Sequence, residues 1–412
     1  MTREADVVVV GGGPAGAVTA AYLARAGHDV VLLERSAAWR WHAGGVFASP
    51  AAVRELRHAG LPAEALARVA RPIPAMRVEL PDRDRTAFRL TYGAETGEGG
   101  AVGFDRSALD PALLAHAADV GVEVRTGTAA TAVVLPDHVQ GASVTVEPRA
   151  TGGDTEVIAT RVIVGADGPR SIVAAEAGML RGPRLGDRVG LSWHVADEPG
   201  DPPKDARMVV LPGGAYCGIA PVPGGRVNIG IVVAGGRWRR RLREGGAAAV
   251  GRDAFTAVPR AGDGVERWRT GEITDRIAGA SPLGARVASR SGPGWAVVGD
   301  AAGFLDPFTG EGLHRALVSA RLAAEAIDAE LRGRAPIGLA AYDRAMAARF
   351  GSKDLVSLVV QGFLARPSLF AYAGRRLARR DDVRATMGLV MGDLVPASHA
   401  LDPRFLFALL RP

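Results

Sequence analysis

The sequence predicts an α/β fold, α+β overall, in which a parallel-sheet domain carries an inserted antiparallel-sheet domain and is followed by a helical C-terminal region. Three patterns support this prediction. Residues 7–34 have the pattern of a strand, a Gly-rich turn, a helix and a strand, short alternating segments fill residues 180–277, and most segments after Gly312 have helical periodicity. The 412 residues are too many for one small core, so more than one module is expected.

Composition excludes several classes of protein. The chain has 50 Lys and Arg against 44 Asp and Glu, and this net charge of +6 is small for its length, so no nucleic-acid partner is expected. Its single cysteine, Cys217, rules out an internal disulfide and a Cys-rich zinc site, and we expect no metal. One cysteine also suits a reducing compartment, which predicts a cytoplasmic protein.

The N-terminal segment begins the parallel sheet. Residues 7–24 carry no charge and are long enough to resemble a membrane span, but three glycines and a proline interrupt them at 11–14. We therefore predict a buried strand over Val7–Val10, a helix over Pro14–Gly27 and a second strand over Asp29–Glu34.

The remaining elements follow in chain order. Helices are expected over 49–58, after 62 and over 105–120, and strands over 75–80, 86–91, 122–125, 131–135, 142–147 and 161–164. The inserted sheet is expected to use strands over 189–195, 208–211, 215–222 and 226–233, followed by a helix over 238–250. A parallel-type strand returns at 295–298.

This return makes the predicted domains discontinuous in sequence. The nucleotide-binding domain is expected to comprise residues 1–75, 105–180 and 286–335, the substrate domain residues 76–104 and 181–285, and the C-terminal helical region residues 336–412.

The Gly-rich turn has the spacing of a dinucleotide site. Gly11 permits the tight turn, Gly13 lets the backbone approach a pyrophosphate, and Gly16 allows close packing of helix on strand. Glu34 ends the next strand, where a carboxylate can accept hydrogen bonds from both ribose hydroxyls of an adenosine. These features predict a Rossmann-type domain whose cofactor contacts also include Pro14, Ala15 and Arg35.

Two later segments favour FAD as the dinucleotide. Asp167 and Gly168 follow the buried strand at 161–164, and Asp300 follows the strand at 295–298, where its carboxylate could bond a ribityl hydroxyl. The segment 306–312 then leads into a long helix whose N-terminus would stabilise a reduced flavin ring. The cofactor residues expected in this segment are Pro307, Gly310, Gly312 and Leu313.

Together these motifs resemble those of FAD-dependent oxidoreductases of the aromatic-hydroxylase superfamily. The segment Pro307–Gly312 is similar to that of the geranylgeranyl reductase branch, and Gly303 stands where aromatic hydroxylases carry His. The resemblance implies that Arg106 lies beside the FAD. The branch typically has Lys-x-Cys-Gly-Gly near the flavin; this chain keeps the glycines, Gly44 and Gly45, but has Trp41 and Ala43 instead of Lys and Cys.

Candidates for the chemistry lie near that loop and on the inserted sheet. His42, next to the two glycines, could donate a proton and is our catalytic candidate. Trp193, His194, Tyr216 and Asn228 are candidate substrate residues, although alternation allows only one of Trp193 and His194 to face a ligand.

The resemblance implies oxidation–reduction of a largely apolar small molecule and favours reduction of a C=C bond by flavin hydride. One alternative is an NAD(P)H- and O₂-dependent monooxygenase that hydroxylates a natural-product intermediate. The other is a non-catalytic flavin-binding protein. Because G-x-G-x-x-G occurs once, we expect NAD(P)H to dock transiently or a separate electron donor to act. The C-terminal helices mix Leu, Phe and Arg; plain packing is favoured over peripheral membrane contact.

Overall fold

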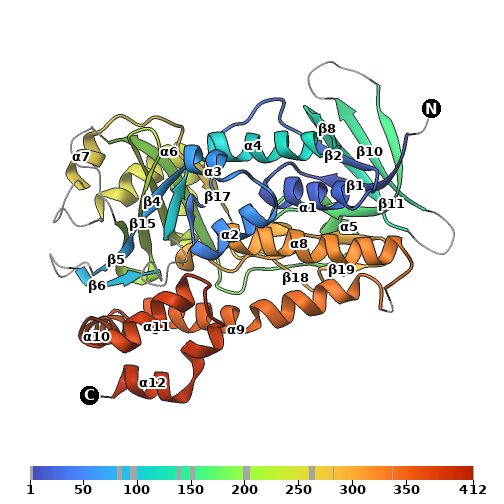
Figure 1. The fold of residues 1–412 in the computed structure, drawn as a ribbon. Coiled ribbons are helices and arrows are strands. Elements are labelled where there is room, and N and C mark those ends of the chain that lie inside the picture. Colours follow the sequence, from blue (N-terminus) through green and yellow to red (C-terminus); the bar gives the residue numbers. More distant parts are fainter. Residues whose placement is uncertain are drawn as a thin grey trace.

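The structure is a computed structural model that describes residues 3–80, 86–92, 100–136, 141–148, 154–197, 205–258, 265–281, 283–335 and 337–411. It confirms the mixed α/β architecture with a helical C-terminus (Figure 1). The short N-terminal strand of the central sheet and the last helix lie at opposite sides of the molecule.

The central sheet is built from distant parts of the chain. Its strand order is β19 (Ser291–Gly292), β20 (Trp295–Val297), β11 (Glu156–Gly165), β1 (Arg3–Val10), β2 (Val30–Glu34) and β8 (Glu123–Thr126). Strand β1 runs parallel to both β2 and β11, and β11 runs parallel to β20. Strands β9 (Thr128–Val134) and β10 (Ala142–Pro148) extend β11 as an antiparallel flap.

Alternation along β1 separates two apolar cores. Val7 and Val9 face helices α1 (Pro14–Arg25) and α8 (Gly312–Leu331), which pack against each other. Val8 and Val10 face the opposite side, towards α5 (Ile172–Glu176). A parallel sheet buried on both faces explains the continuous valine run.

A second sheet of seven strands supplies the other half of the molecule. Its order is β17 (Ala278–Ala280), β13 (Arg188–Ala196), β16 (Arg226–Ala234), β15 (Tyr216–Val222), β14 (Ala206–Val210), β5 (Ala75–Glu79) and β6 (Thr86–Thr91). The antiparallel pattern expected for residues 181–285 is confirmed, and the parallel pair in this sheet joins β14 to β5 from the earlier segment. No short turn joins these two strands, and the long connection between them permits the parallel pairing.

Helices cover this sheet on one face. Helix α6 (Gly235–Thr256) packs on β13 and β16, and α7 (Val265–Thr270) packs on α6. The smaller helices and strands are α2 (Pro50–His58), α3 (Ala63–Val69), α4 (Arg106–Asp119), β3 (Phe47–Ala48), β4 (Ala70–Ile73), β7 (Ala101–Phe104), β12 (Leu180–Arg181) and β18 (Arg286–Val287). The single-turn helices are η2 (Pro212–Gly214), η3 (Gly299–Ala302), η4 (Pro307–Thr309) and η5 (Ala397–Leu401).

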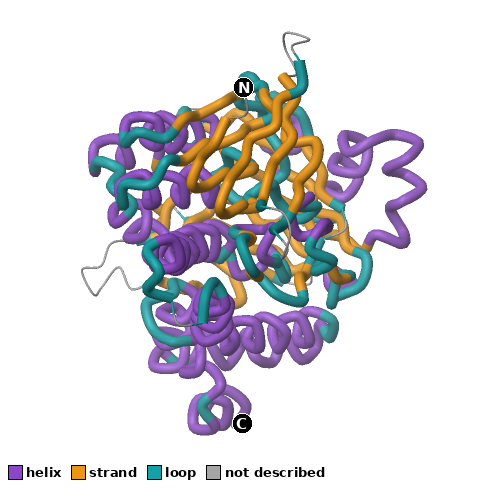
Figure 2. Tube along the Cα trace, turned by 90° about the vertical axis from the view of Figure 1, so that its right-hand side faces the viewer, coloured by secondary structure: helices purple, strands orange, loops and turns teal. Residues whose placement is uncertain are grey.

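The C-terminal helices are α9 (Ala340–Leu364), α10 (Pro367–Arg379), α11 (Asp381–Met391) and α12 (Pro403–Leu410). They lie below the strands in the turned view of Figure 2, and α10 and α11 pack against β6. Gly388 allows this contact, because a Cβ there would overlap the carbonyl oxygen of Thr91. Helix α11 is thereby held at the edge of the second sheet.

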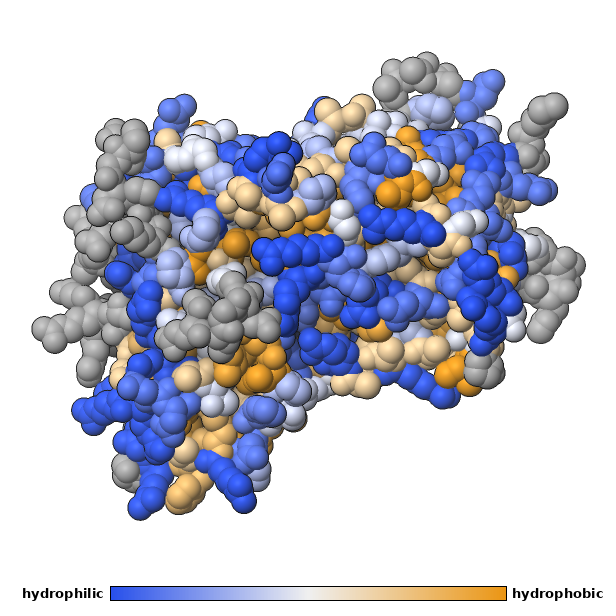
Figure 3. Space-filling model, viewed as in Figure 1, coloured by the Kyte–Doolittle hydropathy of each residue, from blue (hydrophilic) through white to orange (hydrophobic). Residues whose placement is uncertain are grey.

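Within the described ranges, none of the helices is by itself long and apolar enough to span a membrane, while α9 and α10 satisfy the length and composition criteria together as a pair bent by 115°. Hydrophilic residues predominate on the face in Figure 3, with apolar patches between them.

Candidate active site

A cavity of about 1520 Å³ joins the two sheets. Its walls include the residues that follow the carboxyl ends of β1, β2, β11 and β20, where open α/β sheets bind ligands. From there it extends to the face of the second sheet that α6 leaves uncovered, along Met208, Gly218 and Gly230. One cavity therefore connects the dinucleotide motifs to the predicted substrate sheet.

The Gly-rich turn has the geometry that a pyrophosphate requires. Gly11 has φ +108°, and a Cβ there would lie 2.5 Å from the carbonyl oxygen of Ala166. A Cβ at Gly16 would overlap the Gly11 carbonyl, so Gly16 acts in packing and does not line the cavity. A Cβ at Gly13 would meet nothing within 4 Å, so the chain leaves space on the cavity side of this turn. Pro14 and Ala15 begin α1 and line the same space.

Glu34 lies at the end of β2, beside this turn. Its carboxylate accepts hydrogen bonds from the backbone N–H groups of Gly12, at 2.9 Å, and Ser36, at 2.8 Å. These bonds fix the carboxylate at the cavity wall, in the position expected for an adenosine ribose partner. Arg35 is exposed and lines the cavity next to it.

Asp167 offers an unused acceptor. One carboxylate oxygen accepts from the backbone N–H of Ile172 at 2.7 Å, while Oδ1 is buried and has no partner among the described residues. Burial raises the pKa of this carboxyl. Gly168, with φ +83°, follows it on the cavity wall. A buried oxygen without a partner is costly, so a ligand hydroxyl would complete this site.

Asp300 lies in the turn after β20 and lines the cavity. Desolvation by the surrounding protein raises the pKa of its carboxyl. The nearby Arg106 and His42 act in the opposite direction and lower this pKa, but their effect is smaller. Its side chain is exposed to the cavity, so a hydrogen-bond donor from a ligand can reach the carboxylate and stabilise its charge.

The segment 307–313 forms the wall next to Asp300. Pro307, Gly310, Gly312 and Leu313 all line the cavity. Gly310 has φ +68°, and a Cβ there would lie 2.6 Å from the ring of Phe47, so this turn requires glycine. The helix α8 begins directly after it.

Arg106 is buried and held by a bidentate ion pair. Its Nε and Nη2 donate to the two carboxylate oxygens of Asp110 at 2.6 and 2.8 Å, and its Nη1 donates to the Gly45 carbonyl at 3.0 Å. The last bond fixes the loop in which Gly44 and Gly45 line the cavity. Arg106 therefore positions this loop beside Asp300.

His42 lies on the same loop and reaches the cavity. Its side chain is exposed, and its Nδ1 lies 3.3 Å from the Arg40 carbonyl oxygen. This contact leaves Nε2 as the ring atom that could hold or pass a proton in the cavity.

Two of the four candidate substrate residues line the cavity. The Tyr216 hydroxyl donates to Asp306 at 2.6 Å, and the Asn228 amide donates to Ser192 Oγ and to the Trp193 carbonyl, both at 3.1 Å. Both side chains are thus on the cavity face with their polar groups already bonded within the protein.

Trp193 and His194 do not line the cavity. Trp193 points to the opposite face of the sheet and packs edge-on against Phe255 of α6, because successive strand residues face opposite sides. His194 is on the cavity side but is covered by Trp41, whose ring centroid is 4.5 Å away, and it bonds Asp275 at 2.7 Å. Burial lowers the pKa of His194 despite this carboxylate.

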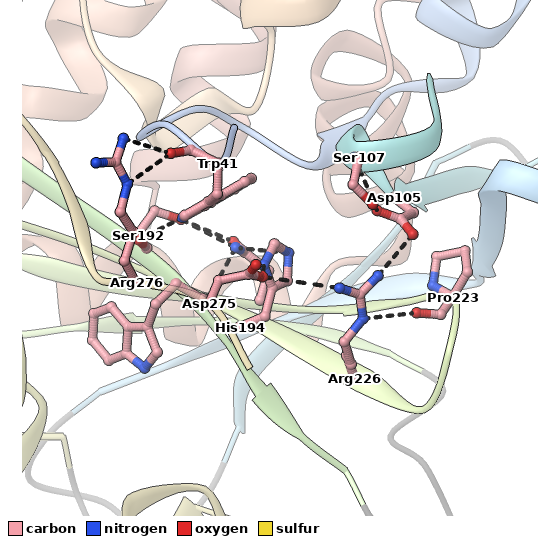
Figure 4. A network of polar contacts seen from close by, with 11 residues as sticks. Trp41, Asp105, Ser107, Ser192, His194, Pro223, Arg226, Asp275 and Arg276 are labelled. Atoms are coloured by element: carbon pink, nitrogen blue, oxygen red, sulfur yellow. Dashed lines mark hydrogen bonds and ion pairs between the residues drawn. The ribbon is translucent and has the colours of Figure 1, made fainter. Parts of the chain in front are cut away.

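His194 belongs to a polar network that the sequence did not reveal (Figure 4). Arg226 links Asp275 to Asp105 at the start of α4, with its closest contact, 2.7 Å, to Asp105. Trp41 donates to the Ser192 carbonyl at 3.0 Å, and its own carbonyl accepts two bonds from Arg276. The network ties the His42 loop and α4 to the second sheet. No local pattern marks it, since its members come from five separate segments.

The Gly-rich turn, the fixed Glu34, the unpaired Asp167 oxygen and the Asp300 carboxylate that is exposed to the cavity fit an FAD, and a substrate space adjoins them. Fold and site together define an FAD-dependent oxidoreductase. The model of the "FAD binding domain" family matches residues 4–351, and the chain belongs to this family.

Curated relatives and solved structures agree with this class. The chain is 30% identical to the menaquinone reductase of Mycolicibacterium smegmatis, over 79% of this chain and 76% of the relative. It is 29% identical to the digeranylgeranylglycerophospholipid reductase of Methanoculleus marisnigri, over 79% of this chain and 77% of the relative. A flavoprotein/dehydrogenase from Cytophaga hutchinsonii shares its fold, with a TM-score of 0.81 at 19% identity over 98% of this chain and 95% of that chain.

Proposed function

We propose that this enzyme reduces a carbon–carbon double bond in a largely apolar, isoprenoid-like small molecule. The observation that carries the proposal is the continuity of the cavity from the dinucleotide motifs to an apolar sheet face. That face presents Met76, Val78, Leu90 and Met208 to the cavity, and the paired glycines Gly218 and Gly230 lie beside Met208 on the next two strands. The names of the two curated relatives support a substrate with an isoprenoid chain.

When bound, reduced FAD supplies the hydride for such a reduction. The chain's own residues then have three tasks. Glu34, Asp167 and Asp300 bind and orient the cofactor, Arg106 holds the loop beside it, and the apolar sheet excludes water. His42 holds a proton at Nε2 and passes it to the second carbon of the double bond.

The electrons come from outside this chain. We propose that NAD(P)H docks transiently at the cavity mouth or that a separate protein supplies them, because the sequence contains one G-x-G-x-x-G. Buried, unpaired Cys217 supports a reducing compartment, so we propose the cytoplasm as the location.

An anaerobic turnover assay tests the reaction. The FAD-loaded enzyme is reduced and incubated with menaquinone or with a digeranylgeranylglycerophospholipid, and products are analysed by mass spectrometry. Addition of one H₂ per double bond is the expected result, with flavin-free protein as control. An oxygenated product and NAD(P)H-dependent O₂ uptake in air would instead identify a monooxygenase. Absence of any turnover with a range of apolar substrates would favour a non-catalytic flavoprotein.

A further inference from the structure

Tyr92 is a buried tyrosine whose hydroxyl has no hydrogen-bond partner among the residues that the structure describes. It is 4% exposed and lines the cavity, so the little surface that it retains is cavity surface. No described group hydrogen-bonds its hydroxyl, whereas the Tyr216 hydroxyl donates to Asp306 and the Tyr342 hydroxyl donates to the Val297 carbonyl at 2.8 Å. Since buried tyrosine hydroxyls usually find a partner, the partner of Tyr92 is expected to come from the cavity.

The other polar side chains on this side of the cavity are already engaged. The Tyr216 hydroxyl donates to Asp306 at 2.6 Å. Arg207, which alternation places on the opposite face of β14, makes a bidentate ion pair with Glu79 at 2.7 and 2.8 Å. Ser192 and Asn228 bond each other. Among the described polar side chains on the cavity face of the second sheet, Ser192, Tyr216 and Asn228 each have a hydrogen-bond partner within the protein, whereas Tyr92, which follows β6, has none.

The side chains packed around Tyr92 are mainly apolar, and Asp393 is a charged group nearby. Its ring lies 5.3 Å from that of Phe47, which itself contacts Gly310 in the segment beside Asp300. On the other side, α11 is pressed against β6 at Gly388, one turn before Met391, which also lines the cavity. The ring of Phe47 therefore lies between Tyr92 and segment 307–312, and Tyr92 is at an otherwise apolar end of the cavity.

The chemistry of the site makes Tyr92 a donor. Burial, together with the negative charge of Asp393, raises the pKa of the phenol, so the hydroxyl keeps its proton. A neutral hydroxyl in an apolar wall favours a ligand that carries a hydrogen-bond acceptor. A bound hydrocarbon would bury the hydroxyl without giving it a hydrogen bond, so its binding is less favourable.

We infer that Tyr92 anchors the substrate by donating a hydrogen bond to an oxygen of an otherwise apolar molecule, such as a quinone carbonyl. The inference rests on the proposed function and deepens it, because it names the substrate class as an apolar molecule with an acceptor oxygen. An oxygen fixed at Tyr92 sets which part of the substrate lies beside segment 307–312.

A pair of matched probes tests the anchor. Menadione, a methylated naphthoquinone, and methylnaphthalene, the same ring system without oxygens, are titrated into oxidised, FAD-loaded enzyme, and binding is followed by the flavin absorbance spectrum. Tyr92→Phe should weaken menadione binding by roughly 3–10-fold, the loss of one neutral hydrogen bond, and change methylnaphthalene binding less than about twofold. Equal changes for both probes, or none for either, would overturn the inference.

Tyr342→Phe is the matched control, since it removes another buried hydroxyl away from the cavity. It should lower the melting temperature and leave binding of both probes unchanged, whereas Tyr92→Phe should not lower the melting temperature. A wild-type enzyme that reduces double bonds but binds both probes equally well overturns the anchor alone. A different outcome would refute the proposed reaction and leave the anchor intact. In that outcome the wild-type enzyme binds menadione more tightly than methylnaphthalene, Tyr92→Phe removes this preference, and no double bond is reduced.

Discussion

Replacement of Asp300 by Asn should weaken FAD binding without lowering the stability of the flavin-free protein. The Asp300 side chain is exposed to the cavity, and the protein groups packed around that cavity raise the pKa of its carboxyl even though Arg106 and His42 are near. In the apoprotein the site therefore disfavours the negative charge of Asp300. When a ligand donates a hydrogen bond to the carboxylate, this bond offsets the unfavourable free energy of the charge. Arg106 keeps its bidentate partner when Asp300 is replaced, because Asp110 accepts from its Nε and Nη2 and the Gly45 carbonyl accepts from its Nη1.

The expected magnitudes follow from these contacts. Loss of one charge-assisted hydrogen bond costs roughly 1.5–3 kcal/mol, or about ten- to 150-fold in FAD affinity. In the apoprotein the sign is opposite. Because the folded-state pKa of Asp300 lies above the ordinary value of 3.8, ionisation destabilises the fold, and this penalty grows as pH rises from 3.8 through the folded-state pKa. Asp300→Asn removes the penalty, so the variant apoprotein should be at least as stable as wild type at neutral pH.

Two measurements check this prediction: thermal unfolding of the flavin-free protein, and titration of FAD by quenching of its fluorescence. Asp110→Asn is the control with the opposite signature. It leaves the buried Arg106 charge poorly compensated, so it should destabilise the apoprotein by up to about 3–5 kcal/mol. Unchanged FAD affinity in the Asp300 variant, or a large loss of apoprotein stability, would refute the reasoning.

Three further predictions concern other parts of the molecule. Gly13→Val should fold normally, because its backbone is extended with φ −70° and no atom lies near its Cβ position, but it should fail to retain FAD on gel filtration. His42→Ala should bind FAD normally and lower the single-turnover rate of substrate reduction by roughly 10²–10⁴-fold; a wild-type rate would show that another group supplies the proton. Burial opposes ionisation of Asp393, but Lys353, 2.8 Å away, and His314 hold its pKa well below the ordinary value. Asp393→Asn should therefore lower the free energy of unfolding by roughly 3–5 kcal/mol at pH 7. This difference should shrink as pH falls from 3.8 towards the lower folded-state pKa, because the carboxyl of the unfolded chain then binds a proton while folded Asp393 keeps its charge; a pH-independent difference in urea titrations would contradict the assignment.

Local patterns were sufficient for much of the fold. The helix expected over 49–58, for example, forms as α2, with the Ser49 hydroxyl accepting from the backbone N–H of Ala52, and the helix expected over 105–120 forms as α4, with Asp105 as its cap. Such features depend on a few neighbouring residues whose chemistry is visible in the sequence. The cofactor motifs belong to the same category, since each follows a strand whose carboxyl end the fold brings to one edge.

Contacts between distant segments could not be predicted in this way. Alternation correctly separated Trp193 from His194, but it could not show that Trp41 covers His194. Tyr92 was missed for the same reason: its role depends on Phe47 and on α11, which reach it from other parts of the chain. No periodicity in one segment encodes the residue that another segment places against it.

The wide separation of the strands in the central sheet has a consequence for biosynthesis. Strand β11 gains its parallel neighbour β20, and α1 gains its packing partner α8, only after residues 295–331 have been made. At about 5–20 residues per second, the nascent chain exposes the apolar faces of β1 and α1 for roughly 10–30 s after β11 is complete. Expression at low temperature, or with added chaperone, should therefore raise the soluble yield. A chain that terminates before α8 should accumulate as aggregate, because the core between α1 and the sheet lacks its cover.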